Sequence, residues 1–472
     1  MTDDFKYMMS DFDYDDIIII VFALHIIGDE LDGLICKYES LLAAHVKEQR
    51  RLNRALPAEK KRIPWSHFCL QISDHHFKRM FRMEPAVFKL LCQKVCSAVG
   101  EDTFKPEDFL MRTGGANRVM KRISGEIKMA FCIRMLAGGS YLDLVPLFHT
   151  STGYLYQVFD VFLGWILCTM DFPLVGWLRE QNWNAVELLA NSFAEKSNGV
   201  FYGPFGALDG LALRIKSPTL SEVADPGNYY CRKGFYALNV QAICDRHKRF
   251  LYCYPSNKGS THDSTAFGNS RLVDLLRELS DELFQRGLFI AGDSAYGLGP
   301  FLVVPYESAN ITGENAVAKD AFNFYLSSCR IHIECAFGEL VMRWGIFWRT
   351  LRFDLKKSCR IIQVAMLLQN FIIENREDGV ADGVYFSTFK INGTDALQSA
   401  ITEQVGEPPR ALVTDNNEPK PAGRRSVDDV QAAILGNRVR DRLTTTIAIN
   451  NMERPMHSHM RYNQEGHIYM LE

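Results

Sequence analysis

The sequence lacks several features that mark specialised classes of protein. No Cys-x-x-Cys pair occurs among its 12 cysteines, and most of them lie within apolar stretches, as Cys132 and Cys244 do. This pattern is typical of small buried side chains in a reducing compartment, with zinc binding or a disulfide framework as the alternative. No internal repeat is evident, so a solenoid or propeller is not indicated.

Long apolar runs and a basic start are also missing. The apolar run from Ile17 to Ile27 is too short to span a bilayer. The residues before it are acidic, whereas a signal peptide needs a basic start. We therefore expect no export signal and no membrane partner.

An excess of one charge is absent as well. The chain has 53 Lys and Arg against 56 Asp and Glu, which gives a net charge of −3. This balance excludes a histone-like polycation, but it is averaged over 472 residues and leaves locally basic surfaces open. Hydrophobic residues make up 47% of the chain, which excludes disorder throughout and is enough for a large core.

Composition divides the chain into four parts. Residues 1–64 form an appendage that is acidic and then basic, and its cations at 47–62 suit either a solvated helix face or a nuclear-import or phosphate-contacting segment. Residues 65–200 read as a helical domain, and residues 201–375 as a domain of strands followed by helices. Residues 376–472 are predicted to be mostly disordered, with a short basic helix that opens at Ser426.

The helical domain contains a helix-turn-helix outline, in which a short helix and a longer one flank a turn at Thr150–Gly153. From Ser140 to Cys168 there is no Lys or Arg. Because contacts to phosphates and base edges normally need cations, we interpret the second helix as a packing or subunit-interface element rather than a DNA-reading helix.

Residues 201–375 predict an α/β domain. Strands are expected at 205–216, 233–245 and 249–255, with a hairpin turn at 245–248, and a fourth strand is expected to end at Asp293. Helices are expected at 270–286 and from about 327 to 349.

Three carboxylates stand out in this domain. Asp209 interrupts an apolar strand, Asp293 ends a later strand, and Glu334 lies in a largely apolar helix. Each alone could be a cap or an ion-pair partner. Together they match the way carboxylates converge in an RNase H-like (retroviral integrase-like) mixed sheet flanked by helices. Hard oxygen ligands suit Mg²⁺ or Mn²⁺, and two such ions about 4 Å apart catalyse phosphodiester chemistry.

Five segments in this order resemble the DDE endonuclease domain of PIF/Harbinger transposases and their domesticated relatives. They are LDG at 208–210, RKGFYALNVQAICD at 232–245, GSTHDSTAF at 259–267, GDSAYGL at 292–298 and RIHIECAFGELVMRW at 330–344. The helical region at 77–170 is also similar. The resemblance excludes residues 1–64 and most of the tail.

The resemblance implies roles for particular residues. The family's metal-binding catalytic triad falls on Asp209, Asp293 and Glu334. His262 and Asp263 match a motif of the family, in which Asp263 either lies near the metals or caps the next helix, and we favour the structural role. The candidates for contact with DNA are Arg232, Lys233, Arg330 and Arg343.

The resemblance also implies a nuclease and strand transferase that acts on DNA with a two-metal Mg²⁺ or Mn²⁺ site. It further implies a separate Myb-like DNA-binding partner. We expect self-association and a location in the nucleus, with the cytoplasm as an alternative. Two other functions stay open: a domesticated, non-cleaving DNA- or chromatin-associated protein, and an RNA nuclease or phosphohydrolase on the same fold.

Overall fold

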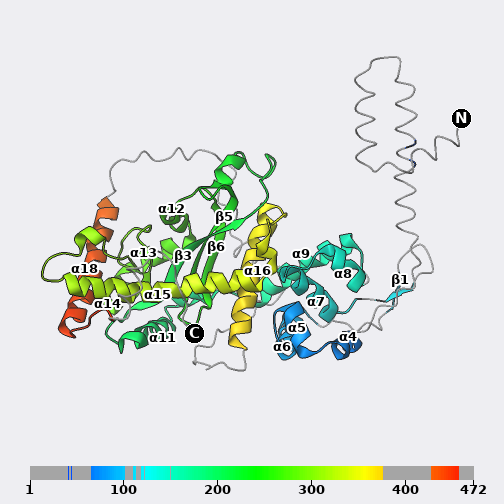
Figure 1. The fold of residues 1–472 in the computed structure, drawn as a ribbon, viewed down its shortest axis with the longest axis horizontal. Helices are drawn as coiled ribbons and strands as arrows, with labels where there is room; N and C mark the ends of the chain where they lie inside the picture. The colour runs from blue at the N-terminus through cyan, green and yellow to red at the C-terminus, as the bar shows by residue number, and fades with distance from the viewer. Residues whose placement is uncertain are drawn as a thin grey trace, which may run out of the picture. The chain divides into compact units, whose positions relative to one another are not determined.

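The computed structural model describes residues 41, 44, 65–100, 110–112, 119–121, 123–148, 150–375 and 427–455. The chain forms two units, Met1–Arg62 and Ile63–Glu472. The fold described here is that of the second unit (Figure 1). The acidic tip, the basic segment at 47–62 and the linker expected after residue 375 lie outside the described residues.

The region before the large sheet is mainly helical, as predicted. A small antiparallel pair, β1 (Leu110–Arg112) and β2 (Val119–Lys121), was not anticipated. Ser124 caps α7 as expected, since its hydroxyl accepts a hydrogen bond from the Ile127 amide. The helices are α4 (Trp65–Gln71), α5 (Asp74–Phe81), α6 (Pro85–Val99), α7 (Gly125–Leu136), α8 (Tyr141–Leu147), α9 (Thr152–Thr169), α10 (Pro173–Arg179) and α11 (Trp183–Ala194).

Helices α8 and α9 form the predicted pair around a short turn. Ser140 and Asp143 build a capping box at the start of α8, and Ser151 caps α9. The apolar side chains of α9 are largely buried, which confirms the packing role inferred from its lack of cations. By length and composition, Thr152–Arg179 is apolar enough to cross a membrane, yet 67% of its most apolar window is buried inside the protein. Whether α8 and α9 act as a helix-turn-helix stays a prediction.

A mixed sheet follows, and β3 (Pro204–Arg214) lies at its centre. On one side β3 pairs antiparallel with β5 (Phe235–Cys244), which also pairs with β6 (Phe250–Lys258) and the short β4 (Tyr230–Cys231). On the other side β3 pairs parallel with β7 (Phe289–Ala291), and β7 pairs parallel with β8 (Leu302–Val303). The predicted hairpin at 245–248 is present, and the Asp245 amide donates a hydrogen bond to the Arg249 carbonyl across it.

Helices cover both faces of this sheet (Figure 1). One apolar cluster joins the sheet to α15 (Ala316–Arg343), α16 (Leu355–Glu374) and the helical region. A second lies between the sheet and α10, α11, α13 (Arg271–Glu278) and α14 (Ser280–Arg286). The arrangement is an α/β fold of the kind expected, in which β3 contributes residues to both apolar clusters and is partly exposed at residues 209–212.

Several boundaries differ from the expectation. The helix predicted at 270–286 is two helices, α13 and α14, which meet at Leu279. Helix α15 begins at Ala316, before the predicted start, and ends at Arg343. The C-terminal helix α18 (Val427–Ile449) extends past the predicted end at Thr444. Short helical turns occur at η3 (Glu195–Ser197), η4 (Pro226–Tyr229), η5 (Ser308–Asn310) and η6 (Gly345–Trp348).

Candidate active site

Asp209 lies midway along β3, opposite Ala242 of β5. Side chains alternate between the faces of a strand, and the odd-numbered neighbours Ala207 and Leu213 pack in the cluster that α15 shares. The carboxylate of Asp209 is therefore directed to the α15 face. Its Oδ1 accepts a hydrogen bond from the Gly210 amide at 2.8 Å.

Asp293 follows β7, the parallel neighbour of β3. Its Oδ1 accepts a hydrogen bond from the Ala295 amide at 2.9 Å, and its carbonyl accepts one from the Tyr296 amide. The Gly292 amide bonds to the Val303 carbonyl of β8. These bonds fold the chain into a tight loop at the carboxyl end of β7, next to the centre of the sheet.

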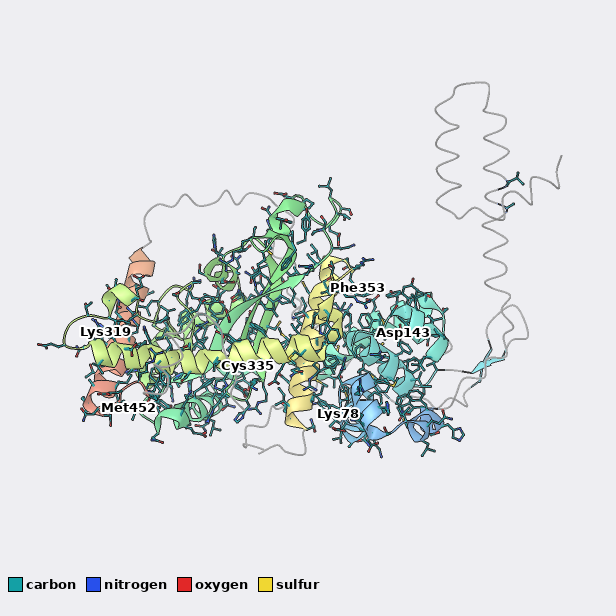
Figure 2. All side chains as sticks on the ribbon, viewed as in Figure 1. Lys78, Asp143, Lys319, Cys335, Phe353 and Met452 are labelled. Carbon is teal, nitrogen blue, oxygen red and sulfur yellow. The ribbon has the colours of Figure 1, made fainter. Side chains whose placement is uncertain are left out.

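Glu334 lies on α15, which packs across β3. Figure 2 shows the next residue, Cys335, in the second half of this helix. The Glu334 side chain is 56% exposed, and its Oε1 lies 3.4 Å from Nη2 of Arg330, one turn earlier. The Arg330 side chain is only 17% exposed. Among the described residues, the Nε of Arg330 is a buried donor with no hydrogen-bond partner.

The pKa of Asp209 is raised to about 6, chiefly by burial, and the negative charges of Asp293 and Glu334 contribute to the rise. The Gly210 amide and the Arg330 guanidinium oppose this rise. The charges of Asp293 and Glu334 therefore reach Asp209, although the three acids come from a strand, the loop after another strand, and a helix.

The donor set fits a divalent metal ion. Three carboxylates offer hard oxygen ligands, and the partly desolvated charge of Asp209 favours a nearby cation. In the described part of the chain, however, no group of three or more His, Cys, Asp or Glu side chains stands close enough to hold an ion. Asp209, Asp293 and Glu334 would hold it, and Glu334 would then have to exchange its ion pair with Arg330 for the metal.

Asp263 lies beside β3 in a hydrogen-bonded network rather than among these acids. Its Oδ1 accepts hydrogen bonds from the side-chain amides of Asn239 and Gln241, both at 3.0 Å. Gln241 in turn accepts a hydrogen bond from the Tyr296 hydroxyl at 2.7 Å. A Cβ on Gly210 would lie 2.3 Å from the Asp263 carboxylate, so only glycine allows this approach. A structural role for Asp263, which we favoured, is compatible with these contacts, but Asp263 is the first residue of the next helix and His262 occupies its N-cap position.

Sequence reasoning missed Asn239, Gln241 and Tyr296. Gln241 is fully buried, and burial raises the pKa of Tyr296, with the charges of Asp263, Asp209 and Asp293 adding to the rise. Polar side chains inside the apolar run of β5 were the available signal, because buried amides need partners. His262 is exposed and occupies the N-cap position of α12 (Asp263–Gly268), where its side chain makes no capping hydrogen bond.

Of the remaining candidates, Arg232 and Lys233 are exposed in the turn between β4 and β5. Nearby, the Arg214 guanidinium lies 4.3 Å from the centre of the Phe235 ring. A parallel bridge between Ile215 and Leu351 brings Arg349 and Arg352 to the same end of β3. We call these five exposed cations the basic ridge: Arg214, Arg232, Lys233, Arg349 and Arg352.

Arg343 lies elsewhere, at the end of α15. Its Nη1 donates a hydrogen bond to the Arg82 carbonyl at 2.9 Å, and its side chain is half-buried. This contact ties α15 to the helical region. Its guanidinium is therefore engaged within the protein, and a contact with DNA stays a prediction.

Comparison with known proteins agrees with this geometry. Residues 208–370 match the family model described as DDE superfamily endonuclease, and the match includes all three acids. The resemblance predicted from the motifs is confirmed. The protein named "Protein ALP1-like" from Arabidopsis thaliana is 24% identical over 322 residues, which cover 65% of this chain and 72% of the relative. No solved structure matched the chain.

At the level of the family, these matches support a transposase-like nuclease. The DDE endonuclease-like segment begins in β3 and ends in α16. It excludes the helical region, and it also excludes α18.

Proposed function

We propose that this chain is a metal-dependent DNA endonuclease of the PIF/Harbinger transposase type, with joining of 3′-hydroxyl ends as a further step. The observation that carries the proposal is the placement of three acids around one sheet: Asp209 on the central strand, Asp293 just after the parallel neighbour β7, and Glu334 on the helix that packs across β3. The strand pairing supports the RNase H-like assignment, because β3 has an antiparallel neighbour, β5, on one side and a parallel neighbour, β7, on the other.

In this proposal Asp209, Asp293 and Glu334 hold Mg²⁺ or Mn²⁺. Such ions activate a water or a 3′-hydroxyl and neutralise charge on the leaving oxygen. The protein's own groups position the DNA. Arg330 pairs with Glu334 through its Nη2, and this donor would be available to a phosphate oxygen once Glu334 turned toward the metal.

The basic ridge supports a polyanionic substrate. Its cations come from three separate segments of the chain, and backbone pairing brings those segments together beyond Asp209 on β3. Lys and Arg side chains that neutralise phosphates supply most of the sequence-independent affinity for nucleic acid. We propose that the ridge holds the DNA backbone while the acids act on one phosphodiester.

Recognition of a particular site is assigned to another protein. Helix α9 buries its apolar residues in the core and contains no Lys or Arg. We therefore propose that a separate Myb-like partner selects the DNA site, and that the chain acts in the nucleus. Self-association is part of the same proposal.

A nicking assay on supercoiled DNA with Mg²⁺ or Mn²⁺ tests the function. The wild type and Asp274→Ala should nick the DNA, whereas Asp209→Ala should not. Asp274 is a matched control because it is an exposed acid that forms an ion pair with Arg277 of the same helix.

Equal behaviour of the wild type and Asp209→Ala would refute the nuclease and favour a non-cleaving DNA- or chromatin-associated protein. Cleavage of RNA or small phosphoesters without cleavage of DNA would favour the third function.

A further inference from the structure

Helix α18 lies outside the DDE endonuclease-like segment, yet it is built into the folded body. It packs against α15 and against β8. Val439, Leu443 and Ile447 recur on one face of the helix and are buried. Figure 1 shows α18 beside the first turns of α15. The helix therefore belongs to the same core as the sheet.

Polar contacts fix the register of α18 on this surface. The Arg440 guanidinium lies 4.2 Å from the centre of the Tyr306 ring, and its Nη1 donates to the Pro305 carbonyl at 3.3 Å. The Tyr306 hydroxyl lies 3.0 Å from Oγ1 of Thr444 and donates to Asp441 at 3.2 Å. These contacts fix which residue of α18 faces the loop at residues 298–299.

The residue of α18 that faces this loop is Gly436. A Cβ at this position would lie 2.7 Å from Cγ of Leu298, and 2.9 Å from both the backbone nitrogen and the carbonyl oxygen of Gly299. Backbone atoms cannot rotate aside as a side-chain tip can. The close approach of α18 to this loop therefore requires glycine in the helix, although glycine is the poorer helix former.

The loop that α18 contacts is the one that contains Asp293. We call residues 292–301 the Asp293 loop. At one end of the loop, the Gly292 amide donates a hydrogen bond to the Val303 carbonyl of β8. Near the other end, the Gly299 amide donates one to the Leu302 carbonyl at 2.9 Å. Between these ends, Tyr296 is buried and bonds to Gln241. The loop thus lies between the sheet on one side and α18 on the other.

We propose that α18 is a positioning helix for the Asp293 loop, and that Gly436 is the positioning residue. The proposal rests on the proposed function in that Asp293 is taken as a metal ligand. It adds that the placement of this ligand depends on a helix outside the DDE endonuclease-like segment.

Gly436→Ala in the full chain tests the proposal. Amide hydrogen exchange in residues 293–299 should become faster, because the added Cβ displaces the Gly299 backbone. Binding of Mn²⁺ alone should weaken by roughly tenfold, the lower range for losing a group that orients a metal ligand. Gly153→Ala is the matched control, since Gly153 is an exposed helical glycine with nothing within 4 Å of the added Cβ.

The outcomes separate the contact from the metal chemistry. Loop exchange equal to that of the wild type, or acceleration spread evenly over the sheet, would overturn the proposal. Faster loop exchange with unchanged Mn²⁺ affinity would overturn it too, because the contact would then not position Asp293. An Asp293→Ala variant that binds Mn²⁺ like the wild type would instead contradict the proposed function, while the exchange of the loop would still decide whether α18 holds it.

Discussion

The two sides of the candidate site are built differently. On the sheet side, Asp209 is partly desolvated and lies beside a buried network in which Gln241 joins Asp263 to Tyr296. On the helix side, Glu334 is 56% exposed and has one ion pair, with Arg330. One side is held by several hydrogen bonds, whereas the other is held by a single surface contact.

This difference suggests separate roles for the two sides in binding a cation. The carboxylate of Asp209 is fixed in place by its strand, but its charged form is disfavoured. Desolvation raises its pKa by more than the Gly210 amide and the Arg330 guanidinium lower it. The carboxylate of Glu334 is largely exposed on its helix, so water can solvate its charge and the side chain can adopt several rotamers. We infer that the sheet side is preorganised for a cation and that the helix side completes the site by turning toward it.

The largest expected effect is at Asp209. Asp209→Asn should lower nicking by about 10³-fold or more, since a lost metal ligand removes several kcal/mol of transition-state stabilisation. Glu334→Gln should also lose nicking. A plasmid nicking rate measured at saturating Mn²⁺ checks both variants, and activity of Asp209→Asn near that of the wild type would break the assignment.

The same variant should be more stable than the wild type at high pH. The pKa of Asp209 is about 6 when folded and ordinarily near 3.9 when unfolded, so in metal-free protein its ionisation destabilises the fold. This loss of stability develops as the pH rises from about 4 to about 6. Asn does not titrate. Melting temperatures in EDTA should therefore agree at pH 4, and Asp209→Asn should melt higher at pH 8.

The buried network should give the next largest effect. Gln241→Leu removes the acceptor of the Tyr296 hydroxyl and one donor to Asp263, which leaves polar groups unpaired in the core. We expect a loss of about 1–3 kcal/mol in unfolding free energy, measured by denaturant titration. Tyr296→Phe should cost less, because it removes only one donor. If Gln241→Leu were as stable as the wild type, the contrast between the two sides would not hold.

The sequence predicted most of the sheet side and little of its support. Local patterns of apolar residues and turns indicate Asp209, the hairpin at 245–248 and the order of the longer strands along the chain. The bonds of Gln241 do not, because its partners Asp263 and Tyr296 are distant in the chain. The early start of α15 was missed where Asn323, Ser327 and Ser328 interrupt the apolar pattern. The contact of Gly436 with Gly299 was also out of reach, since nothing in the sequence pairs α18 with the Asp293 loop.

The basic ridge should affect binding rather than cleavage of bound DNA. Changing Arg232 and Lys233 together to Glu reverses two charges at the exposed β4–β5 turn. We expect about tenfold weaker DNA binding at moderate salt, and a shallower dependence of affinity on salt, as fewer counterions are released. Fluorescence anisotropy over a salt series measures both. Asp225→Asn, a change of one exposed acid, serves as a control for altered net charge.

The smallest effect concerns the stability of the helix side. Glu334→Gln loses one exposed ion pair with Arg330, and such pairs contribute about 0–1 kcal/mol. We therefore expect the unfolding free energy of metal-free Glu334→Gln to stay within about 0.5 kcal/mol of the wild type. Added Mn²⁺ should then separate the two proteins, because an ion that binds only the folded state stabilises it by an amount that rises with the logarithm of its affinity. The wild type should gain melting temperature with Mn²⁺, and Glu334→Gln should gain less. Equal gains would mean that Glu334 does not turn toward the metal, and the helix side would then be a surface ion pair only.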